Sequence, residues 1–243
     1  MTRLDVELVQ RGLARSRTAA QVAIAAGKVA VAGQPATKPA QPVTASDPIA
    51  MSGADHYVSR AAHKLLGALD ESGTAVPARV LDAGASTGGF TQVCLERGAR
   101  RVYAIDVGHG QLAPELRSDP RVVVKEHTNL RDLGLDQLDA EPVGLVVADV
   151  SFISLRLLLE PLLAVLAPTG TALLLVKPQF EVGRAGLDGH GVVRDERLRA
   201  DSVDRISQAA AALGWQTGWR GRSGLPGENG NVEFFLKLTR RLG

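Results

Sequence analysis

The sequence predicts a small α+β unit at the N-terminus, followed by an α/β domain whose doubly wound sheet is mostly parallel with an antiparallel last strand. Beyond Pro77, apolar runs of strand length alternate with helical patterns, which is typical of a parallel sheet. The runs 143–147 and 172–176 are apolar throughout, as expected of strands that are buried on both faces. The last two strand patterns, 215–223 and 231–240, are joined by a glycine-containing turn and predict a closing hairpin.

The 243 residues suit one large domain, or a small domain joined to a medium one. Hydrophobic residues make up 45% and charged residues 22%, which is ordinary for a globular protein that folds without a disulfide or a metal. The single cysteine, Cys94, can form neither an internal disulfide nor a zinc cluster, and this favours a cytoplasmic protein. No run reaches the roughly 18 apolar residues of a membrane span. Residues 1–10 lack the apolar block of a signal peptide, so we expect neither membrane insertion nor secretion.

Two short helices and a small β element are predicted near the N-terminus. Apolar residues at helical spacing predict a helix over 3–13, and Ser16 and Gly27 are suitable start and stop residues for a second helix. Alternation over 28–33 predicts a strand, and the proline-rich stretch after it excludes a central strand there. Residues 43–51 can hold another short strand.

Charge is distributed unevenly between the two expected domains, 1–51 and 59–243, which the polar linker 52–58 joins. The first domain holds six basic residues against three acidic ones, whereas the whole chain has a net charge of only +2. Clustered lysines and arginines attract phosphates, so this asymmetry suggests a nucleic-acid partner; a solvated basic surface is the alternative. The candidate RNA contacts are Arg3, Arg15, Arg17, Lys28 and Lys38.

The second domain begins with an amphipathic helix over 59–73, whose apolar face is formed by Leu65, Leu66 and Leu69. Strands and helices then alternate. Five parallel strands are expected at 78–84, 101–108, 121–129, 143–151 and 171–178, with helices at 90–98, near 154–166 and at about 194–213, before the closing hairpin.

A glycine-rich turn follows the first of these strands. The strand delivers Asp82, and Gly84, Gly88 and Gly89 let the backbone turn sharply and approach a ligand at the sheet edge. The spacing is not the G-x-G-x-x-G of dinucleotide sites, so a ligand without a pyrophosphate, such as adenosylmethionine, fits better. Asp106, 24 residues after Asp82, ends the second strand, where an acidic residue would accept hydrogen bonds from both ribose hydroxyls. The alternative is a structural turn without a ligand.

Four charged residues are expected at this same edge. Asp149 and Lys177 each follow an apolar strand, and Glu233 precedes a last strand that runs the other way. Lys64 lies on the helix that enters the domain. A ribose 2′-hydroxyl is a poor nucleophile and needs a positioned base, which a lysine can provide when burial and a second cation lower its pKa. We therefore expect hydroxyl methylation; ordinary ion pairs at a sheet edge are the alternative.

Several longer stretches carry a family resemblance: SRAAHKL, LDAGASTGGFTQ, DVGHGQL, RVVVKEHTN, VADVSFISL, LVKPQFEVG, GHGVV and GNVEFFL. They resemble the TlyA family of ribosomal RNA cytidine-2′-O-methyltransferases, whose members are also called haemolysins. The first 45 residues resemble an RNA-binding domain of the S-four type, through RLDVELVQRGLARSRTAAQ and GKVAVAGQPATKP. The resemblance implies a Rossmann-like adenosylmethionine-dependent methyltransferase fold. It also implies a bacterial cytoplasmic enzyme that acts on ribosomal RNA within ribosomal subunits, and no protein partner is predicted.

The catalytic domain is also similar to the wider FtsJ-type group of RNA 2′-O-methyltransferases, which use a Lys-Asp-Lys-Glu tetrad. The tetrad carries over to Lys64, Asp149, Lys177 and Glu233, with Lys177 as the central catalytic lysine. At 55–58 the family carries Arg-Ala-Trp-Val where this chain has Asp-His-Tyr-Val, so no role of that arginine or tryptophan carries over. The turn and the matching stretches together give these candidate cofactor contacts: Asp82, Gly84, Ser86, Gly88, Gly89, Phe90, Asp106, Thr128, Asn129 and Asp149.

Three other functions are considered: a pore-forming haemolysin, a small-molecule methyltransferase and an inactive RNA-binding protein. The lack of a long amphipathic stretch argues against the first, the basic N-terminal domain against the second, and the complete tetrad against the third. Scattered histidines show no metal-ligand spacing, so no metal site is predicted. Trp215 and Trp219 are expected to pack in the hairpin, while Phe152 and Phe180 are candidates for contacting a flipped base or the adenine.

Overall fold

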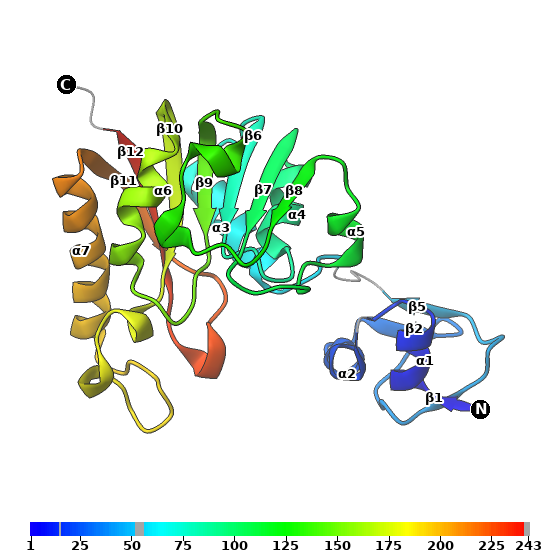
Figure 1. The fold of residues 1–243 in the computed structure, drawn as a ribbon. Coiled ribbons are helices and arrows are strands. Elements are labelled where there is room, and N and C mark those ends of the chain that lie inside the picture. Colours follow the sequence, from blue (N-terminus) through cyan, green and yellow to red (C-terminus); the bar gives the residue numbers. More distant parts are fainter. Residues whose placement is uncertain (15, 52–55, 241–243) are drawn as a thin grey trace. The chain divides into compact units, whose positions relative to one another are not determined.

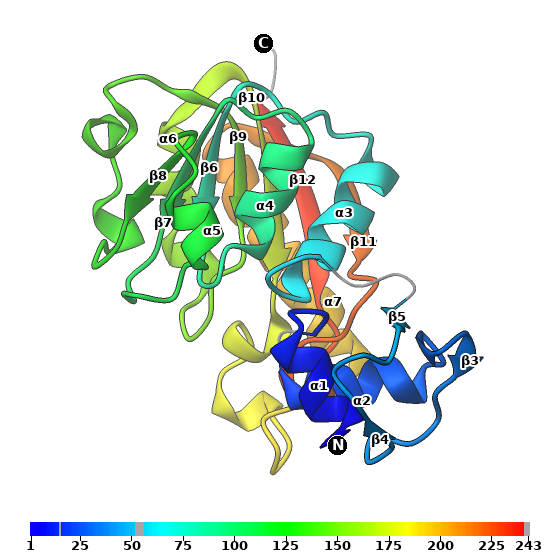
Figure 2. The same cartoon turned by 90° about the vertical axis from the view of Figure 1, so that its right-hand side faces the viewer.

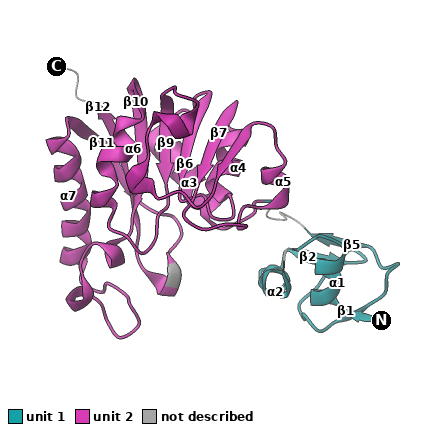
Figure 3. Ribbon diagram, viewed as in Figure 1, with its two compact units in different colours: residues 1–56 teal, residues 57–243 magenta. Residues whose placement is uncertain are grey.

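A computed structural model describes residues 1–14, 16–51 and 56–240, which form two compact units, 1–56 and 57–243 (Figures 1 and 3). The predicted linker 52–58 falls mostly outside the described residues. Arg15, a predicted RNA contact, also lies outside them. No helix in the described part of the chain is long and apolar enough to cross a membrane.

The first unit packs two helices against short strands. α1 (Leu4–Gln10) is shorter than predicted, and α2 (Arg17–Ala25) starts as predicted, because the Ser16 hydroxyl accepts a hydrogen bond from the Ala19 N–H at 3.2 Å. A separate core forms around Leu4, Leu8 and Ile24. The strands are β1 (Thr2–Arg3), β2 (Val29–Val31), β3 (Gln34–Pro35), β4 (Pro42–Val43) and β5 (Ile49–Met51). β1 pairs with β4, and β3 is an edge strand that pairs with β2. Pro35 in β3 and Pro42 in β4 therefore both lie in edge strands, where proline is tolerated.

The second unit contains a seven-stranded sheet in the order β11-β12-β10-β9-β6-β7-β8. Strands β10, β9, β6, β7 and β8 are parallel, and β12 runs antiparallel between β10 and β11. The predicted doubly wound sheet with an antiparallel last strand is therefore confirmed. The strands are β6 (Arg79–Ala83), β7 (Arg101–Ile105), β8 (Val122–Lys125), β9 (Val143–Ala148), β10 (Leu166–Val176), β11 (Trp215–Arg222) and β12 (Phe234–Arg240).

Helices cover both faces of this sheet (Figures 1 and 2). One face packs against α3 (Ala61–Ser72), α4 (Gly89–Glu96) and α5 (Pro114–Arg117), and the other against α6 (Leu159–Ala164) and α7 (Glu196–Ala212). The faces are distinct because neighbouring strand residues point to opposite sides, as Val80 and Leu81 do. Short 3₁₀ helices occupy Leu130–Asp132, Leu135–Leu138, Leu155–Leu157, Pro178–Phe180, Arg184–Gly186 and Glu228–Gly230.

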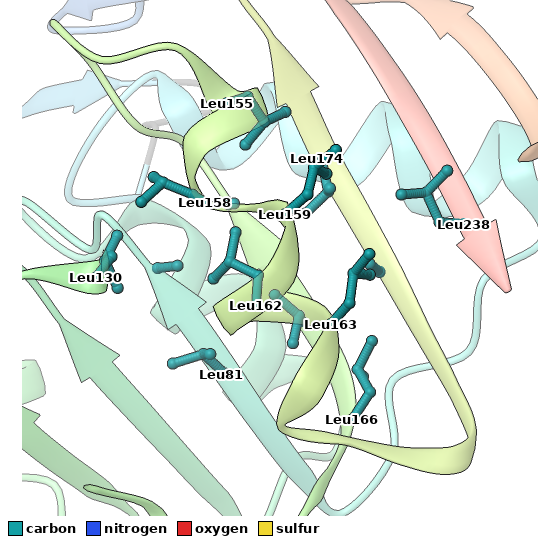
Figure 4. Packing of buried hydrophobic residues seen from close by; sticks show 14 of the residues in the cluster. Leu81, Leu130, Leu155, Leu158, Leu159, Leu162, Leu163, Leu166, Leu174 and Leu238 are labelled. Atoms are coloured by element: carbon teal, nitrogen blue, oxygen red, sulfur yellow. The ribbon is translucent and has the colours of Figure 1, made fainter. Parts of the chain in front are cut away.

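The leucines of α6 form the centre of one core layer. Figure 4 shows Leu159, Leu162 and Leu163 pointing towards strand residues that include Leu81 and Leu174. Each leucine buried in this way contributes roughly 1.5–3 kcal/mol relative to an exposed one. The predicted packing of Trp215 and Trp219 in the hairpin is also confirmed. Trp215 belongs to the core on one face of the sheet, and Trp219 packs against the core on the other face.

The predicted helix over 154–166 is wrong in its extent. Residues 155–157 form a 3₁₀ turn, and Leu166 already belongs to β10, which begins five residues before the predicted start at 171. The cause is strand pairing. The Val143 N–H donates to the Val165 carbonyl at 3.0 Å and Leu166 pairs with Val143, so the chain joins the sheet at the residues where the helix was expected to continue. Helix α5 was not predicted, since four residues give no readable period.

Candidate active site

Four charged side chains meet in a cavity of about 820 Å³ at the carboxyl edge of the parallel strands. Asp149 directly follows β9, and Lys177 directly follows β10. Glu233 precedes β12, and the antiparallel direction of that strand brings it to the same edge. Lys64 reaches the edge from α3. The convergence expected from the sequence is therefore present in the structure.

The four residues form two tight ion pairs. Lys64 Nζ lies 2.7 Å from Glu233 Oε2, and Lys177 Nζ lies 2.6 Å from Asp149 Oδ1. The side chains are only 11%, 2%, 11% and 16% exposed in that order, so each charge depends on its partner for compensation. Lys177 also donates a hydrogen bond to Ser151 Oγ at 2.8 Å. Because an ammonium group has three N–H donors, Lys177 can also bind a ligand hydroxyl in the cavity that it lines.

Gly89 allows α3 to deliver Lys64. A Cβ atom at Gly89 would lie 2.2 Å from Ser59 Oγ and 3.0 Å from the Ala62 nitrogen, so only a glycine lets the starts of α3 and α4 approach this closely. Gly89 and Phe90 line a smaller adjoining cavity of about 220 Å³, which Asp149 and Lys177 also line. The structure therefore gives Gly89 a packing role that the sequence did not suggest.

Gly84 and Asp106 also line the large cavity. Gly84 has φ +82°, and a Cβ there would lie 2.8 Å from the Asp149 carbonyl oxygen, so the position requires glycine. The Asp106 carboxylate accepts hydrogen bonds from the Ser86 and Gly108 N–H groups, each at 2.8 Å. Two backbone donors fix this carboxylate, and its remaining lone pairs can accept hydroxyl groups of a ligand.

The structure divides the ten predicted cofactor contacts. Gly84, Ser86, Asp106, Asn129 and Asp149 line the large cavity, and Gly89 and Phe90 line the smaller one. Asp82, Gly88 and Thr128 line neither of these two cavities. Gly88 faces α5, where a Cβ would meet Leu116 Cδ1 at 2.3 Å. Thr128 donates its hydroxyl hydrogen bond to the Glu126 carbonyl.

Asp82 lies beneath the site and does not face the cavity. Its carboxylate is fully buried and accepts a hydrogen bond from Thr91 Oγ1 at 2.6 Å. Burial raises the pKa of Asp82 to about 7, and the nearby charges of Asp149 and Asp106 act in the same direction. The predicted direct contact with a cofactor is corrected to a supporting position under the turn.

The raised pKa of Asp82 predicts a pH-dependent stability. Between about pH 4 and pH 7 the folded protein holds a proton on Asp82 that the unfolded chain has released, so the free energy of unfolding falls as pH rises through this window. Asp82→Asn cannot ionise and keeps an oxygen that accepts from Thr91. Urea unfolding across this range should show a flatter pH dependence for that variant than for wild type. Exposed Asp201→Asn serves as the control, and an unchanged slope in Asp82→Asn would refute the assignment.

Two phenylalanines stand at the cavity that the tetrad lines. Phe152 is 88% exposed with φ +65°, and its ring centroid lies 5.4 Å from that of Phe180. Both rings line the cavity, and their contact with a flipped base or the adenine stays a prediction. An exposed phenylalanine held by a strained backbone offers a flat apolar face to a planar ligand.

Sequence reasoning missed several cavity residues. Ser151 could have been found from its place two residues after Asp149. Gln179, whose Nε2 lies 3.5 Å from Glu233 Oε1, likewise stands two residues after Lys177. Gly227 gave no signal, because only folding brings it against the Glu233 carboxylate. Arg60, Gln111 and Arg131 also line the cavity.

The basic residues of the first unit differ in their partners. The buried Asp5 carboxylate pairs with Arg3 at 3.0 Å and with Arg17 at 3.2 Å, while both arginine side chains stay about half exposed. Arg11 instead binds Glu7 and backbone carbonyls of the first unit. Lys28 and Lys38, the other described candidates, are exposed. Asp5 thus orients two of the predicted RNA contacts at the surface.

Two further sequence predictions concern the linker and metal binding. Asp55 lies outside the described residues, but Tyr57 packs within the second unit, where its hydroxyl donates to Glu96 Oε2 at 3.0 Å. The described residues contain no group of three or more His, Cys, Asp or Glu side chains that could hold a metal ion.

Comparison with known proteins gives matches over both units. The model of the FtsJ-like methyltransferase family matches residues 57–240, and that of the S4 domain matches 2–49. The chain is 52% identical over 239 residues to the 16S/23S rRNA (cytidine-2′-O)-methyltransferase TlyA of Mycobacterium tuberculosis, covering 97% of this chain and 89% of the relative. It is 38% identical to Hemolysin A of Brachyspira hyodysenteriae, covering 96% and 97%. A solved structure of a hemolysin-like protein from Streptococcus thermophilus has a TM-score of 0.76 and 36% identity, covering 98% and 88%.

Proposed function

Because the chain belongs to the FtsJ-like methyltransferases, and among them to the TlyA family of rRNA 2′-O-methyltransferases, we propose that it methylates the ribose 2′-hydroxyl of a cytidine in ribosomal RNA. The observation that carries this is the pair of Lys–carboxylate contacts, Lys64–Glu233 and Lys177–Asp149, in one cavity. The cavity volume is within the range of small-molecule sites. Ribosomal RNA as substrate also fits the cytoplasmic location expected from the sequence.

Adenosylmethionine is the proposed methyl donor, and the residues at one end of the cavity fit it. It supplies an electrophilic methyl group on a sulfonium. Asp106, fixed by two backbone N–H groups, is placed to accept hydrogen bonds from the two ribose hydroxyls. Gly84 and Asn129 line the cavity beside it. Asp149, which lines the same cavity, offers a negative charge that would attract a positively charged sulfonium.

Lys177 is the proposed proton acceptor for the 2′-hydroxyl. Its ion pair with Asp149 and its hydrogen bond to Ser151 fix the position of the amine. The remaining bonding position of the nitrogen is available to a ligand in the cavity that Lys177 lines. In its neutral form the amine would accept the hydroxyl proton while that oxygen bonds to the methyl carbon; the methyl–sulfur bond would break, and the sulfonium would leave as a neutral thioether. Lys64, held by Glu233, contributes a positive charge to the cavity in which the hydroxyl oxygen loses its proton.

The first unit is proposed to bind the RNA backbone. Arg3 and Arg17 are oriented by Asp5, and Lys28 and Lys38 are exposed on the same small unit. Arg15, which lies outside the described residues, is included in this proposal from the sequence alone. Phosphate contacts of this kind position a substrate without reading its sequence, so selection of the nucleotide falls to the catalytic cavity.

The test is methyl transfer by the purified chain from labelled adenosylmethionine to ribosomal subunits. Label should appear in RNA, and digestion should release it as a 2′-O-methylated nucleoside. Transfer to small molecules but not to RNA would favour a small-molecule methyltransferase, and no transfer would favour an inactive RNA-binding protein. Lysis of washed red cells by detergent-free protein would instead support a haemolysin.

Asp106→Ala is expected to weaken adenosylmethionine binding while the fold is kept. A hydrogen bond to a charged acceptor contributes about 1.5–3 kcal/mol, so the dissociation constant should rise by roughly one to two orders of magnitude. Titration calorimetry measures this directly, with the exposed Asp201→Ala on α7 as the control. Unchanged affinity of the Asp106 variant would remove that residue from the cofactor site.

A further inference from the structure

Gly227 lies directly against the Glu233 carboxylate. A Cβ atom built at Gly227 would lie 2.0 Å from Glu233 Oε1 and 2.6 Å from Cδ, far inside contact distance. Glu233 is only 2% exposed and binds Lys64 through Oε2 at 2.7 Å. Its carboxylate therefore has little room to move aside without leaving Lys64.

The segment that carries Gly227 is a tight turn closed on itself. The Gly227 N–H donates to the Asn231 carbonyl at 2.9 Å, and the Gly230 N–H donates back to the Gly227 carbonyl at 3.2 Å. Just outside this turn, the Ser223 N–H before it donates to the Glu233 carbonyl after it at 2.9 Å. The backbone on both sides of Glu233 is thus fixed by its own hydrogen bonds.

Asn231 anchors this turn to a second glycine-containing segment. Its side chain is almost fully buried; Oδ1 accepts from the Val193 N–H at 3.1 Å and Nδ2 donates to the Gly191 carbonyl at 3.0 Å. The stretches GHGVV and GNVEFFL, far apart in the sequence, therefore meet through this amide side chain. Asn229, one residue before GNVEFFL, adds a weaker contact from its Nδ2 to the His190 carbonyl at 3.3 Å. Neither stretch supplies a tetrad residue other than Glu233, which leaves positioning as the function of their contact.

We propose that Gly227 and Asn231 are positioning residues that hold the Glu233 carboxylate against Lys64. The proposal rests on the proposed function only in the expectation that this pair serves methyl transfer. Gly227 supplies the space that the carboxylate occupies, and Asn231 fixes the turn that keeps Gly227 there. Neither residue needs to touch the RNA or the cofactor.

Gly227→Ala should push the Glu233 carboxylate away from Lys64. Gly227 has no positive φ, so alanine is conformationally acceptable there and its effect is steric. A displacement of about 1 Å in a catalytic group typically lowers the rate by roughly 10²-fold. We expect that loss in the single-turnover rate, with unchanged adenosylmethionine affinity. Gly224→Ala, on the same connection but with open space around it, is the matched control and should keep the wild-type rate.

The double variant Gly227→Ala with Glu233→Ala separates a clash with Glu233 from a general defect of the loop. Once the carboxylate is gone, the added methyl has nothing to displace, so Gly227→Ala should cause no further loss of rate in the Glu233→Ala background. The same comparison is made by thermal unfolding, where Gly227→Ala should lower the midpoint in wild type and much less in Glu233→Ala. If Gly227→Ala fails to fold, the double variant should fold.

Asn231→Ala tests the anchor and should also lower the single-turnover rate without changing adenosylmethionine affinity. A full rate in Gly227→Ala would overturn the proposal, and so would a loss of equal size in the Glu233→Ala background. Because the unfolding comparison needs no substrate, it still tests the contact if the wild-type chain transfers no methyl group to ribosomal RNA. Failure of the proposed function is thereby distinguished from failure of this inference.

Discussion

Lys177→Ala is expected to lower the single-turnover rate of methyl transfer by roughly 10²–10⁴, which is the usual contribution of a general base. The Lys177 amine lies 2.6 Å from Asp149 Oδ1 and 2.8 Å from Ser151 Oγ, so these two contacts hold it in place. Adenosylmethionine affinity should change little, because the residue is assigned to the ribose that is methylated. Rapid-quench kinetics on ribosomal subunits measures the rate, and calorimetry measures the affinity.

Lys177→Arg distinguishes a base from a positive charge. A guanidinium group stays protonated at any working pH and still pairs with a carboxylate such as Asp149. If Lys177 accepts the proton, the arginine variant should be nearly as impaired as the alanine variant. A near-normal rate in Lys177→Arg would show that only the charge matters and that the proton leaves by another route.

Removing residues 1–56 is expected to abolish methylation of ribosomal RNA and to leave adenosylmethionine binding intact. The first unit has its own core around Leu4, Leu8 and Ile24, while the cavity and both large cores belong to the second unit. The truncated chain should therefore keep its cofactor site and lose its phosphate contacts. Calorimetry with adenosylmethionine confirms folding, and methyl transfer to ribosomal subunits measures the loss.

A point variant tests the same phosphate contacts without removing the first unit. Lys38→Glu reverses an exposed charge far in sequence from the catalytic residues, and it should weaken RNA binding and reduce the salt dependence of binding by about one unit of slope or more. A truncated enzyme that modifies subunits at the full rate would show that the first unit is dispensable.

The fold could be predicted from local patterns where strands are long and apolar. The runs at β9 and β10 and the hairpin of β11 and β12 were found because buried strands of a parallel sheet have few polar residues. The extent of the helix after β9 was wrong because the apolar pattern of α6 continues into Leu166, which pairs with Val143 in the sheet. Periodicity alone does not show where the helix ends and the strand begins. Helix α5 and the 3₁₀ turns are too short to give a period.

The charged site residues could be predicted because each stands at the end of an apolar strand or in a motif. Asp82 was placed in the cofactor site by the same logic, yet its side chain points into the protein, since the alternation along β6 turns it away from the cavity. The contact of Asn231 with Gly191 joins two distant segments and leaves no local signal. The contact of Gly227 with Glu233 lies within one connection, but it depends on how the turn between them folds, which no periodicity shows.

Mapping 2′-O-methyl groups on ribosomal RNA shows whether this chain methylates a ribose 2′-hydroxyl of that RNA. RNA is compared from cells that have the gene, cells that lack it, and cells that carry only Lys177→Ala. We expect at least one cytidine that is methylated only in the presence of the intact gene. Identical methylation maps in all three, with a chain that is expressed and folded, would contradict it.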